Sequence, residues 1–389
     1  MAGRKTPRRL ATRLIHPDEN APTDFAALAV PTYRGSTVLF ERMADVSDVN
    51  RPDQYRYGLY GTPTVRDLAL RIAAIEGAGH CVIVPSGQAA IALSYFALCR
   101  SGDHVLVPES AYGPNRELAA GPLKRLGVEV ERYEPMIGGD IASLIRDNTR
   151  LIWCESPGSI TMEVQDVPAI CAAAKARGVP VAIDNTYGAG ILFDAFGAGV
   201  DISIQALTKY AGGHSDLLLG SIAARDEQID RKVREAQRLF GMGVSPDDCS
   251  LVLRGLKTLD LRLRHLGQSA MTVARWLGER DEVTAVLHPA FPDCPGHEYW
   301  KRDFSGSASI FSIVLGNRSP EQVVKFVDAL KLFRIGYSWG GANSLALCYP
   351  DLRRPTPETG PLLVRLNVGL EDPLDLIEDL EQALAHSSR

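Results

Sequence analysis

The sequence predicts an α/β protein with a central parallel or mixed sheet and helices on both of its faces. From about residue 64, short runs rich in β-branched residues alternate with longer segments of helical periodicity, the pattern of strands joined by crossover helices. Several of these runs are apolar throughout, as expected for strands buried on both faces. The predicted strands cover residues 81–85, 104–108, 128–133, 150–155, 179–184, 201–205 and 219–224.

Two segments between these strands are predicted to be helices. Residues 63–78 and 166–178 carry apolar side chains at helical spacing, and each segment stops at a glycine. Together with the strands, they indicate a large α/β domain over residues 61–255. An internal repeat or a low-complexity tract is not visible in the sequence.

The pattern changes after about residue 255, which predicts a smaller α+β domain over residues 256–389. A long helical stretch and a Pro-rich loop come first, followed by an apolar strand, a helix, a second apolar strand and a last helix. In chain order, the segments up to and including the second strand cover residues 261–281, 288–297, 308–315, 319–332 and 362–369.

The first sixty residues are rich in Pro, Gly and Tyr and show little periodicity. They are predicted to form an N-terminal arm, residues 1–60, that needs another surface to pack on, and a neighbouring subunit is one candidate. The basic start of the chain lacks the apolar core of a secretory signal.

Composition excludes several classes of function. The 389-residue chain has 45% hydrophobic and 23% charged residues and a net charge of -5, so no basic surface for nucleic acid is expected. Seven cysteines, an odd number without a CxxC pair, indicate reduced thiols and predict neither disulfides nor a metal site. No apolar run approaches the eighteen or so residues of a membrane span. A cytoplasmic protein is expected.

An aspartate and a lysine follow neighbouring predicted strands. Asp184 ends the strand in "VAIDNTYGAG", and Lys209 follows the next strand in "QALTKYAGGHSD". Because open α/β sheets present ligand-binding groups at the carboxyl ends of their strands, both side chains are expected in one crevice. An Asx turn or a helix cap is the alternative interpretation of an isolated Asp184.

A lysine and a carboxylate in one crevice suit pyridoxal 5'-phosphate (PLP). The lysine forms the Schiff base with the aldehyde, and the carboxylate keeps the pyridine nitrogen protonated. Ser86, Gly87 and Gln88 lie between a strand and an apolar helix, where backbone N–H groups and the helix dipole bind phosphate. The hydroxyl of Thr208 could add a further donor.

Two more residues are candidates for ligand contacts. Tyr112 follows the strand 104–108, where it either stacks on the cofactor ring or pads a loop. Arg365 is the only charged residue of an apolar strand, and a buried guanidinium requires a partner. That partner is either one structural salt bridge or the α-carboxylate of an amino acid held by a two-point contact.

Six segments, in order along the chain, resemble the Cys/Met-metabolism family of PLP enzymes, and within it the bacterial cystathionine β-lyases. The resemblance runs from about residue 30 to about residue 385 and implies the aspartate-aminotransferase fold (fold type I), a homotetramer of tight dimers and α,β-elimination from sulfur amino acids. The segments are "ESPGSITMEVQDVPAI", "IDNTYGAG", "QALTKYAGGHSD", "GHEYWKRDFSGSASIFS", "YSWGG" and "VRLNVGLED".

The resemblance also implies the roles of individual cofactor residues. Lys209 resembles the Schiff-base lysine and proton carrier, Asp184 the pyridine partner and Tyr112 the stacking ring. Gly87 and Gln88 resemble the backbone cradle of the cofactor phosphate.

Five further residues resemble family positions at the edge of the site. Thr208 resembles a hydroxyl donor to the phosphate, and Tyr57 the tyrosine that reaches the phosphate and substrate from the adjacent subunit. Ser338 and Arg365 resemble the substrate-carboxylate clamp, and Trp339 the β-lyase tryptophan beside it.

One position departs from the family pattern. Relatives usually carry Tyr-x-Arg at this point, but "YGLY" places Leu59 where the phosphate-gripping arginine stands. Arg56 or another arginine takes over that contact, or the phosphate is held less tightly. Tyr187, where relatives often have tryptophan or phenylalanine, is a milder departure.

Two alternatives to a β-lyase stay open. One keeps the cofactor but changes the reaction to γ-elimination, γ-replacement or a specialised natural-product step. The other is a cofactor-binding scaffold or regulator descended from an enzyme.

Overall fold

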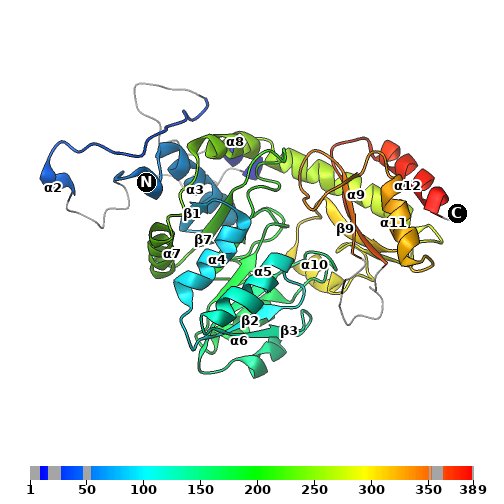
Figure 1. Ribbon diagram of the computed structural model, residues 1–389, viewed down its shortest axis with the longest axis horizontal. Coiled ribbons are helices and arrows are strands. Elements are labelled where there is room, and N and C mark those ends of the chain that lie inside the picture. The colour runs from blue at the N-terminus through cyan, green and yellow to red at the C-terminus, as the bar shows by residue number, and fades with distance from the viewer. Residues whose placement is uncertain (1–8, 16–27, 47–53, 350–351, 353–361, 388–389) are drawn as a thin grey trace, which may run out of the picture.

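The computed structural model describes residues 9–15, 28–46, 54–349, 352 and 362–387. Two sheets organise this part of the chain, one of seven strands and one of five. Figure 1 shows the two regions side by side, with the long helix α9 (Leu259–Gly278) running from the first region into the second.

The larger sheet is mixed, as the sequence predicts, and all seven predicted strands are present. Strand β7 runs antiparallel to both of its neighbours, and the other adjacent pairs are parallel. In spatial order the strands are β1 (His80–Val84), β7 (Gly220–Ala224), β6 (Ile202–Gln205), β5 (Val181–Asp184), β4 (Thr149–Glu155), β2 (His104–Pro108) and β3 (Glu129–Tyr133).

Helices cover both faces of this sheet. Val105 belongs to a buried cluster that includes α4 (Gly87–Leu98), whereas its neighbour Leu106 belongs to a cluster that includes α6 (Val167–Lys175). Because successive side chains of a strand point to opposite faces, a strand between two helical layers is apolar at every position. This explains the uninterrupted apolar runs of the sequence.

Local signals set the bounds of several helices in this region. Pro63 lies in the first turn of α3, and Gly77 ends the helix in the left-handed region at φ 73°. The helices and helical turns are η1 (Gly58–Tyr60), α3 (Pro63–Glu76), α4, α5 (Gly113–Leu118), η2 (Ala119–Leu123), η3 (Gly138–Leu144), α6, α7 (Glu227–Leu239) and α8 (Pro246–Leu256).

The five-stranded sheet forms the C-terminal region with α9 and three further helices. Phe311 of the sheet is buried in one cluster with Phe326 and Leu380 of two of these helices. The strands in spatial order are β10 (Arg334–Ile335), β11 (Leu345–Cys348), β12 (Leu363–Asn367), β9 (Ile310–Val314) and β8 (Ala285–Leu287). The three helices are α10 (His297–Asp303), α11 (Pro320–Ala329) and α12 (Pro373–Ser387).

The described N-terminal segments contain two short helices, α1 (Leu10–Ile15) and α2 (Met43–Val46). Figure 1 shows α2 at the far left, apart from both sheets. Leu28 and Leu39 are 92% and 90% exposed, so this stretch presents apolar side chains to solvent. The remainder of the predicted arm lies outside the described residues.

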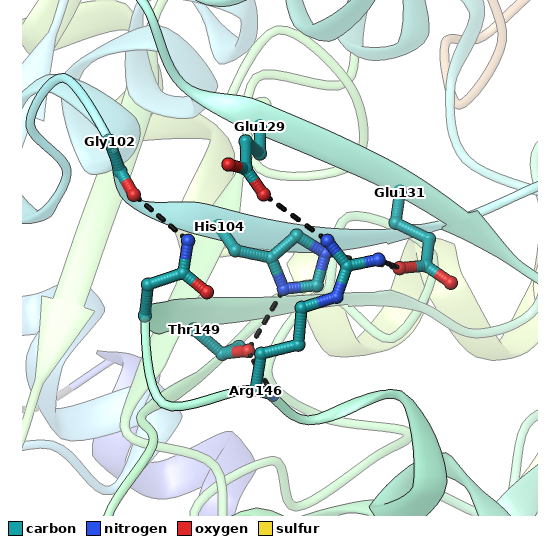
Figure 2. A network of polar contacts seen from close by, with 7 residues as sticks. Gly102, His104, Glu129, Glu131, Arg146 and Thr149 are labelled. Carbon is teal, nitrogen blue, oxygen red and sulfur yellow. Dashed lines mark hydrogen bonds and ion pairs between the residues drawn. The ribbon is translucent and has the colours of Figure 1, made fainter.

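A polar cluster secures the edge of the larger sheet, well away from the carboxyl ends of β5 and β6. His104 on β2 contacts Thr149 Oγ1 through Nδ1 at 2.9 Å and has Nε2 3.3 Å from Glu131 Oε2. Figure 2 shows the Arg146 guanidinium reaching the carboxylates of Glu129 and Glu131 on the edge strand β3. This cluster, here called the edge cluster, ties β2, β3 and the start of β4 together.

In the described part of the chain, no helix is both long and apolar enough to cross a membrane. The same residues contain no group of three His, Cys, Asp or Glu side chains that could hold a metal ion.

Candidate active site

A cavity of about 250 Å³ lies where the carboxyl ends of β4, β5 and β6 face the C-terminal region. Side chains of both regions line it, including Asp184 and Lys209 from the first and Ile310 and Trp339 from the second. Such a crevice is where open α/β sheets bind ligands.

Lys209 lies in the turn after β6, and its amine is placed by residues of the C-terminal region. Nζ donates a 2.7 Å hydrogen bond to Ser338 Oγ and lies 5.4 Å from the centre of a Trp339 ring. Burial, and then the charge of Arg365, lower the pKa of Lys209 to about 8, against the opposing effect of Asp184. An appreciable fraction of the amine is therefore neutral, and so nucleophilic, near neutral pH.

The backbone next to Lys209 requires a glycine. Gly340 has φ +78°, and a Cβ there would lie 3.1 Å from Lys209 Cβ. The "YSWGG" segment can therefore approach the lysine closely only because its fourth residue lacks a side chain.

Asp184 ends β5 and lines the same cavity. Its Oδ1 accepts the amide of Thr186 at 3.0 Å and the Thr186 hydroxyl at 2.5 Å. The amide contact is the Asx turn expected as the alternative, so the residue has this local role as well as its place in the cavity. Burial raises the pKa of Asp184, opposed by Thr186 and by the charge of Lys209. A partly buried carboxylate of this kind is stabilised by a cationic ligand group.

The loop from Ser86 to Gln88 forms one end of the cavity. Ser86 is the N-cap of α4, and its Oγ accepts the Ala89 amide at 3.0 Å. A Cβ on Gly87 would lie 2.7 Å from Ala206 Cβ, so only glycine fits between α4 and the lysine turn. The first backbone amides of α4 are thus held at the cavity, as an anion site requires.

Gln88 and Thr208 line the cavity, and their side chains already form hydrogen bonds to backbone groups of the same chain. Gln88 Nε2 donates to Pro114 O at 3.1 Å, while its buried Oε1 has no partner among the described residues. Thr208 Oγ1 donates to Leu219 O and accepts the Leu219 amide, both at 3.2 Å. The expected phosphate role of the Thr208 hydroxyl requires it to leave or share these long contacts.

Tyr112 lies at the N-cap of α5, lines the cavity and is 42% exposed as a residue. Its backbone amide donates to Glu155 Oε2 at 2.7 Å. The ring is therefore accessible to a ligand, while its backbone is fixed to the sheet.

Arg365 lies on β12, directly behind the cavity wall. Its Nη1 and Nη2 donate to the carbonyls of Ser159 and Tyr337 at 3.2 and 2.8 Å, and both of these residues line the cavity. Among the described residues no carboxylate pairs with this guanidinium, and burial lowers its pKa. The structural salt bridge considered from the sequence is therefore not found there, and a buried positive charge is left for an anionic ligand.

Tyr57 does not line the cavity of its own chain. It is 47% exposed and contacts the Tyr60 ring edge-on at 6.1 Å between centroids. Its expected action in a neighbouring subunit stays a prediction. Leu59 belongs to the helical turn η1 and packs beside Gly243.

The sequence interpretation did not single out Glu155, Ser159 or Tyr337, which also line the cavity. Glu155 carried the same signal as Asp184, an acid at the end of an apolar strand. Tyr337 lies in the quoted "YSWGG" segment, but nothing in the pattern distinguishes it from a surface tyrosine.

The cavity fits PLP group by group. A partly buried carboxylate suits the pyridine nitrogen, and an amine of lowered pKa suits the aldehyde. An exposed aromatic residue suits the ring face, and a helix N-terminus suits the phosphate. These requirements are met by Asp184, Lys209, Tyr112 and the start of α4.

The family model described as Cys/Met metabolism PLP-dependent enzyme matches residues 11–385. The chain belongs to this family. PLP is accordingly its cofactor, and its fold is that of the fold type I PLP enzymes.

Individual relatives cover nearly the whole chain. A protein of Bordetella avium, named cystathionine beta-lyase, is 41% identical over 374 residues, covering 94% of each chain. Cystathionine beta-lyase MetC of Escherichia coli is 40% identical over 391 residues, covering 97% of this chain and 98% of the relative. The structure of apo CalE6, a methionine gamma lyase from Micromonospora echinospora, has a TM-score of 0.87 at 31% identity and covers 97% and 99%.

Proposed function

We propose that the protein is a carbon–sulfur β-lyase that eliminates L-cystathionine, or a related cysteine S-conjugate, to a thiol, pyruvate and ammonia. The observation that carries the proposal is a lysine amine of lowered pKa and a partly buried carboxylate in one cavity, in front of a buried arginine that has no acidic partner among the described residues. The cystathionine β-lyases at 40–41% identity support the same reaction.

Cofactor binding uses residues of the first region. Lys209 holds the aldehyde, Asp184 the pyridine nitrogen, Tyr112 the ring face, and the α4 start with Thr208 the phosphate. When bound, PLP supplies an electron sink for the charge that develops at the substrate Cα.

Lys209 then moves the protons. Once the substrate's amino group has replaced it at the aldehyde, the neutral Lys209 amine takes the Cα proton, the electron pair left by that proton forms the Cα–Cβ double bond, and the Cβ–S pair leaves with sulfur. The ammonium of Lys209 protonates the departing thiolate, which completes the thiol. The released enamine hydrolyses to pyruvate and ammonia. An amine with a pKa near 8 serves both as the base and as the acid of this sequence.

The substrate carboxylate is bound by Arg365 and Ser338. Arg365 reaches it through the guanidinium behind the cavity wall, and Ser338 offers the hydroxyl that Lys209 contacts. Trp339 closes this side of the cavity, because its ring lies beside the amine and packs against Tyr210 at 5.5 Å.

The same proposal includes the assembly and location of the protein. We divide the chain into an arm (1–60), a large domain (61–255) and a small domain (256–389), assembled as a cytoplasmic homotetramer of dimers. The exposed Leu28 and Leu39 support an arm that packs on a second subunit. Tyr57 reaches the partner's cavity in this arrangement. Mixing inactive Tyr57→Ala and Lys209→Ala proteins during refolding should restore part of the activity.

Incubation of the purified protein with L-cystathionine, cystine and methionine tests the reaction. We expect pyruvate and homocysteine from cystathionine, with Lys209→Ala as the inactive control. Release of 2-oxobutyrate and cysteine instead would assign γ-elimination. A visible absorption band that no sulfur amino acid alters would indicate a cofactor-binding scaffold.

A further inference from the structure

Glu155 is a buried acid beside Asp184 that the mechanism above does not use. It ends β4, pairs in register with Asp184 on β5 and is 5% exposed. Burial and the neighbouring charge of Asp184 raise its pKa. Two acids side by side in a buried sheet end are unfavourable for folding, so a neutral residue at position 155 would stabilise the sheet unless the carboxylate has a specific task.

Both oxygens of Glu155 are engaged by loops of the site. Oε2 accepts the Tyr112 amide at 2.7 Å, and Oε1 accepts the Ser159 hydroxyl at 2.6 Å. Ser159 in turn offers its carbonyl to Arg365 Nη1 at 3.2 Å. The Glu155 carboxylate thus connects Tyr112 with the loop of Ser159. The carbonyl of Ser159 in turn accepts a hydrogen bond from Arg365.

The backbone around Glu155 prevents it from moving with either loop. Its own amide donates to Gln165 Oε1 at 2.9 Å, and Gln165 Nε2 donates to Tyr133 Oη at 3.1 Å. Tyr133 is fully buried on the edge strand β3, which β2 separates from β4. The carboxylate is therefore anchored to the sheet, while its two partners belong to loops.

We propose that Glu155 is a positioning residue that sets the Tyr112 ring against the cofactor and Arg365 toward the substrate carboxylate at the same time. In this role Glu155 acts through Tyr112 and Ser159 and contacts neither the cofactor nor the substrate carboxylate itself. The substrate half of the inference rests on the proposed β-elimination, whereas the cofactor half requires only that PLP binds.

The connection has two branches that can be separated. Glu155→Ala removes both branches, and Ser159→Ala removes only the branch toward Arg365. Glu155→Gln keeps both contacts, because its amide oxygen can accept the Tyr112 N–H and its amide nitrogen can donate to the Ser159 hydroxyl. Glu163→Gln is the matched control, since Glu163 is as buried as Glu155, lies in the loop that carries Ser159 and accepts a 2.5 Å hydrogen bond from the Thr161 hydroxyl.

The experiment measures three quantities on each variant: cofactor affinity of the apo-protein by titration with PLP, the visible circular dichroism of bound PLP, and KM against kcat for L-cystathionine. For Glu155→Ala we expect about tenfold or more weaker cofactor binding, a reduced dichroic band and a raised KM, because the hydrogen bonds to the Tyr112 amide and the Ser159 hydroxyl are lost. Ser159→Ala should raise KM with an unchanged dichroic band. Glu155→Gln should recover most of each quantity, and Glu163→Gln should match the parent.

A purely structural role predicts a different result. Glu155→Ala would then lower the melting temperature while the folded fraction keeps parental cofactor affinity, dichroism and KM, and this result would overturn the inference. If Glu155→Ala does not fold, Ser159→Ala with parental KM would also overturn it. A parent that releases no pyruvate would refute the β-lyase proposal alone, because the PLP titration and the dichroic band still test the cofactor half.

Discussion

Lys209 Nζ donates a 2.7 Å hydrogen bond to Ser338 Oγ, a contact between residues 129 positions apart. The lysine follows a strand of the larger sheet, and the serine lies in the loop before β11 of the smaller one. The reactive amine is thus placed by both regions, so a change in their packing should alter the chemistry before it alters either fold.

Lys209→Ala should abolish turnover and leave the fold intact. The amine bonds to Ser338 alone among the described residues, at the edge of a cavity, so little packing is lost with it. We expect pyruvate release to fall by orders of magnitude with a nearly unchanged melting temperature. Elimination near the parental rate would show that another group moves the proton.

Asp184→Asn should retain part of the cofactor but slow elimination by orders of magnitude. The amide cannot stabilise a protonated pyridine nitrogen, so the electron sink weakens. Its oxygen can still accept the Thr186 contacts, which keeps the local turn. Single-turnover kinetics at saturating PLP measure the effect. Elimination by the variant at the parental rate would mean that Asp184 serves only the local Asx turn.

Arg365→Leu should act through substrate affinity. The guanidinium bonds to two cavity-wall carbonyls but to no described carboxylate, so it is available to an anionic substrate. We expect KM to rise much more than kcat falls, with the cofactor's absorption spectrum unchanged. Loss of soluble, folded protein would instead show that the carbonyl contacts serve the fold.

Much of the fold could be predicted because the apolar runs of the larger sheet are unambiguous, and the alternation of Val105 and Leu106 between two buried layers explains them. The three-residue β8 and two-residue β10 are too short for any periodicity to reveal. Asp184 and Lys209 could be paired because adjacent parallel strands end at one edge. The bond from Lys209 to Ser338 depends on how two regions pack, which no local pattern encodes.

The edge cluster should make stability fall in mild acid. Burial, and then the charge of Arg146, lower the pKa of His104, against the raising effects of Glu131 and Glu129. The unfolded chain therefore binds the proton more tightly, with a pKa of about 6.5. The contribution of neutral His104 to the free energy of unfolding is fully present above about pH 6.5. It is lost as the pH falls from there toward the lower pKa that His104 has in the folded state.

His104→Gln tests this pH dependence. The variant should show a smaller drop in melting temperature between pH 7.5 and pH 5 than the parent, even if it is less stable throughout. His386→Gln, on the exposed face of α12, is the control. An equal drop in His104→Gln and the parent would assign the acid sensitivity to other groups.

Leu59 stands where the family resemblance places a phosphate-binding arginine, and Arg56 is the nearest replacement along the chain. Arg56 Nη2 donates to Gln54 Oε1 at 3.2 Å, but its buried Nε has no partner among the described residues. An unsatisfied buried donor is unfavourable, and a phosphate oxygen would satisfy it. We therefore expect Arg56 to supply the missing cation.

A titration of apo-protein with PLP measures this substitution. A charge-assisted hydrogen bond contributes about 1.5–3 kcal/mol, or roughly tenfold to a hundredfold in affinity, so Arg56→Ala should weaken cofactor binding by about that factor. Leu59→Arg should gain little, because the site already has its cation. Arg34→Ala is the control, since this arginine of the same N-terminal segment pairs with Asp247. A large gain in Leu59→Arg without loss in Arg56→Ala would mean that the phosphate site lacks a cation.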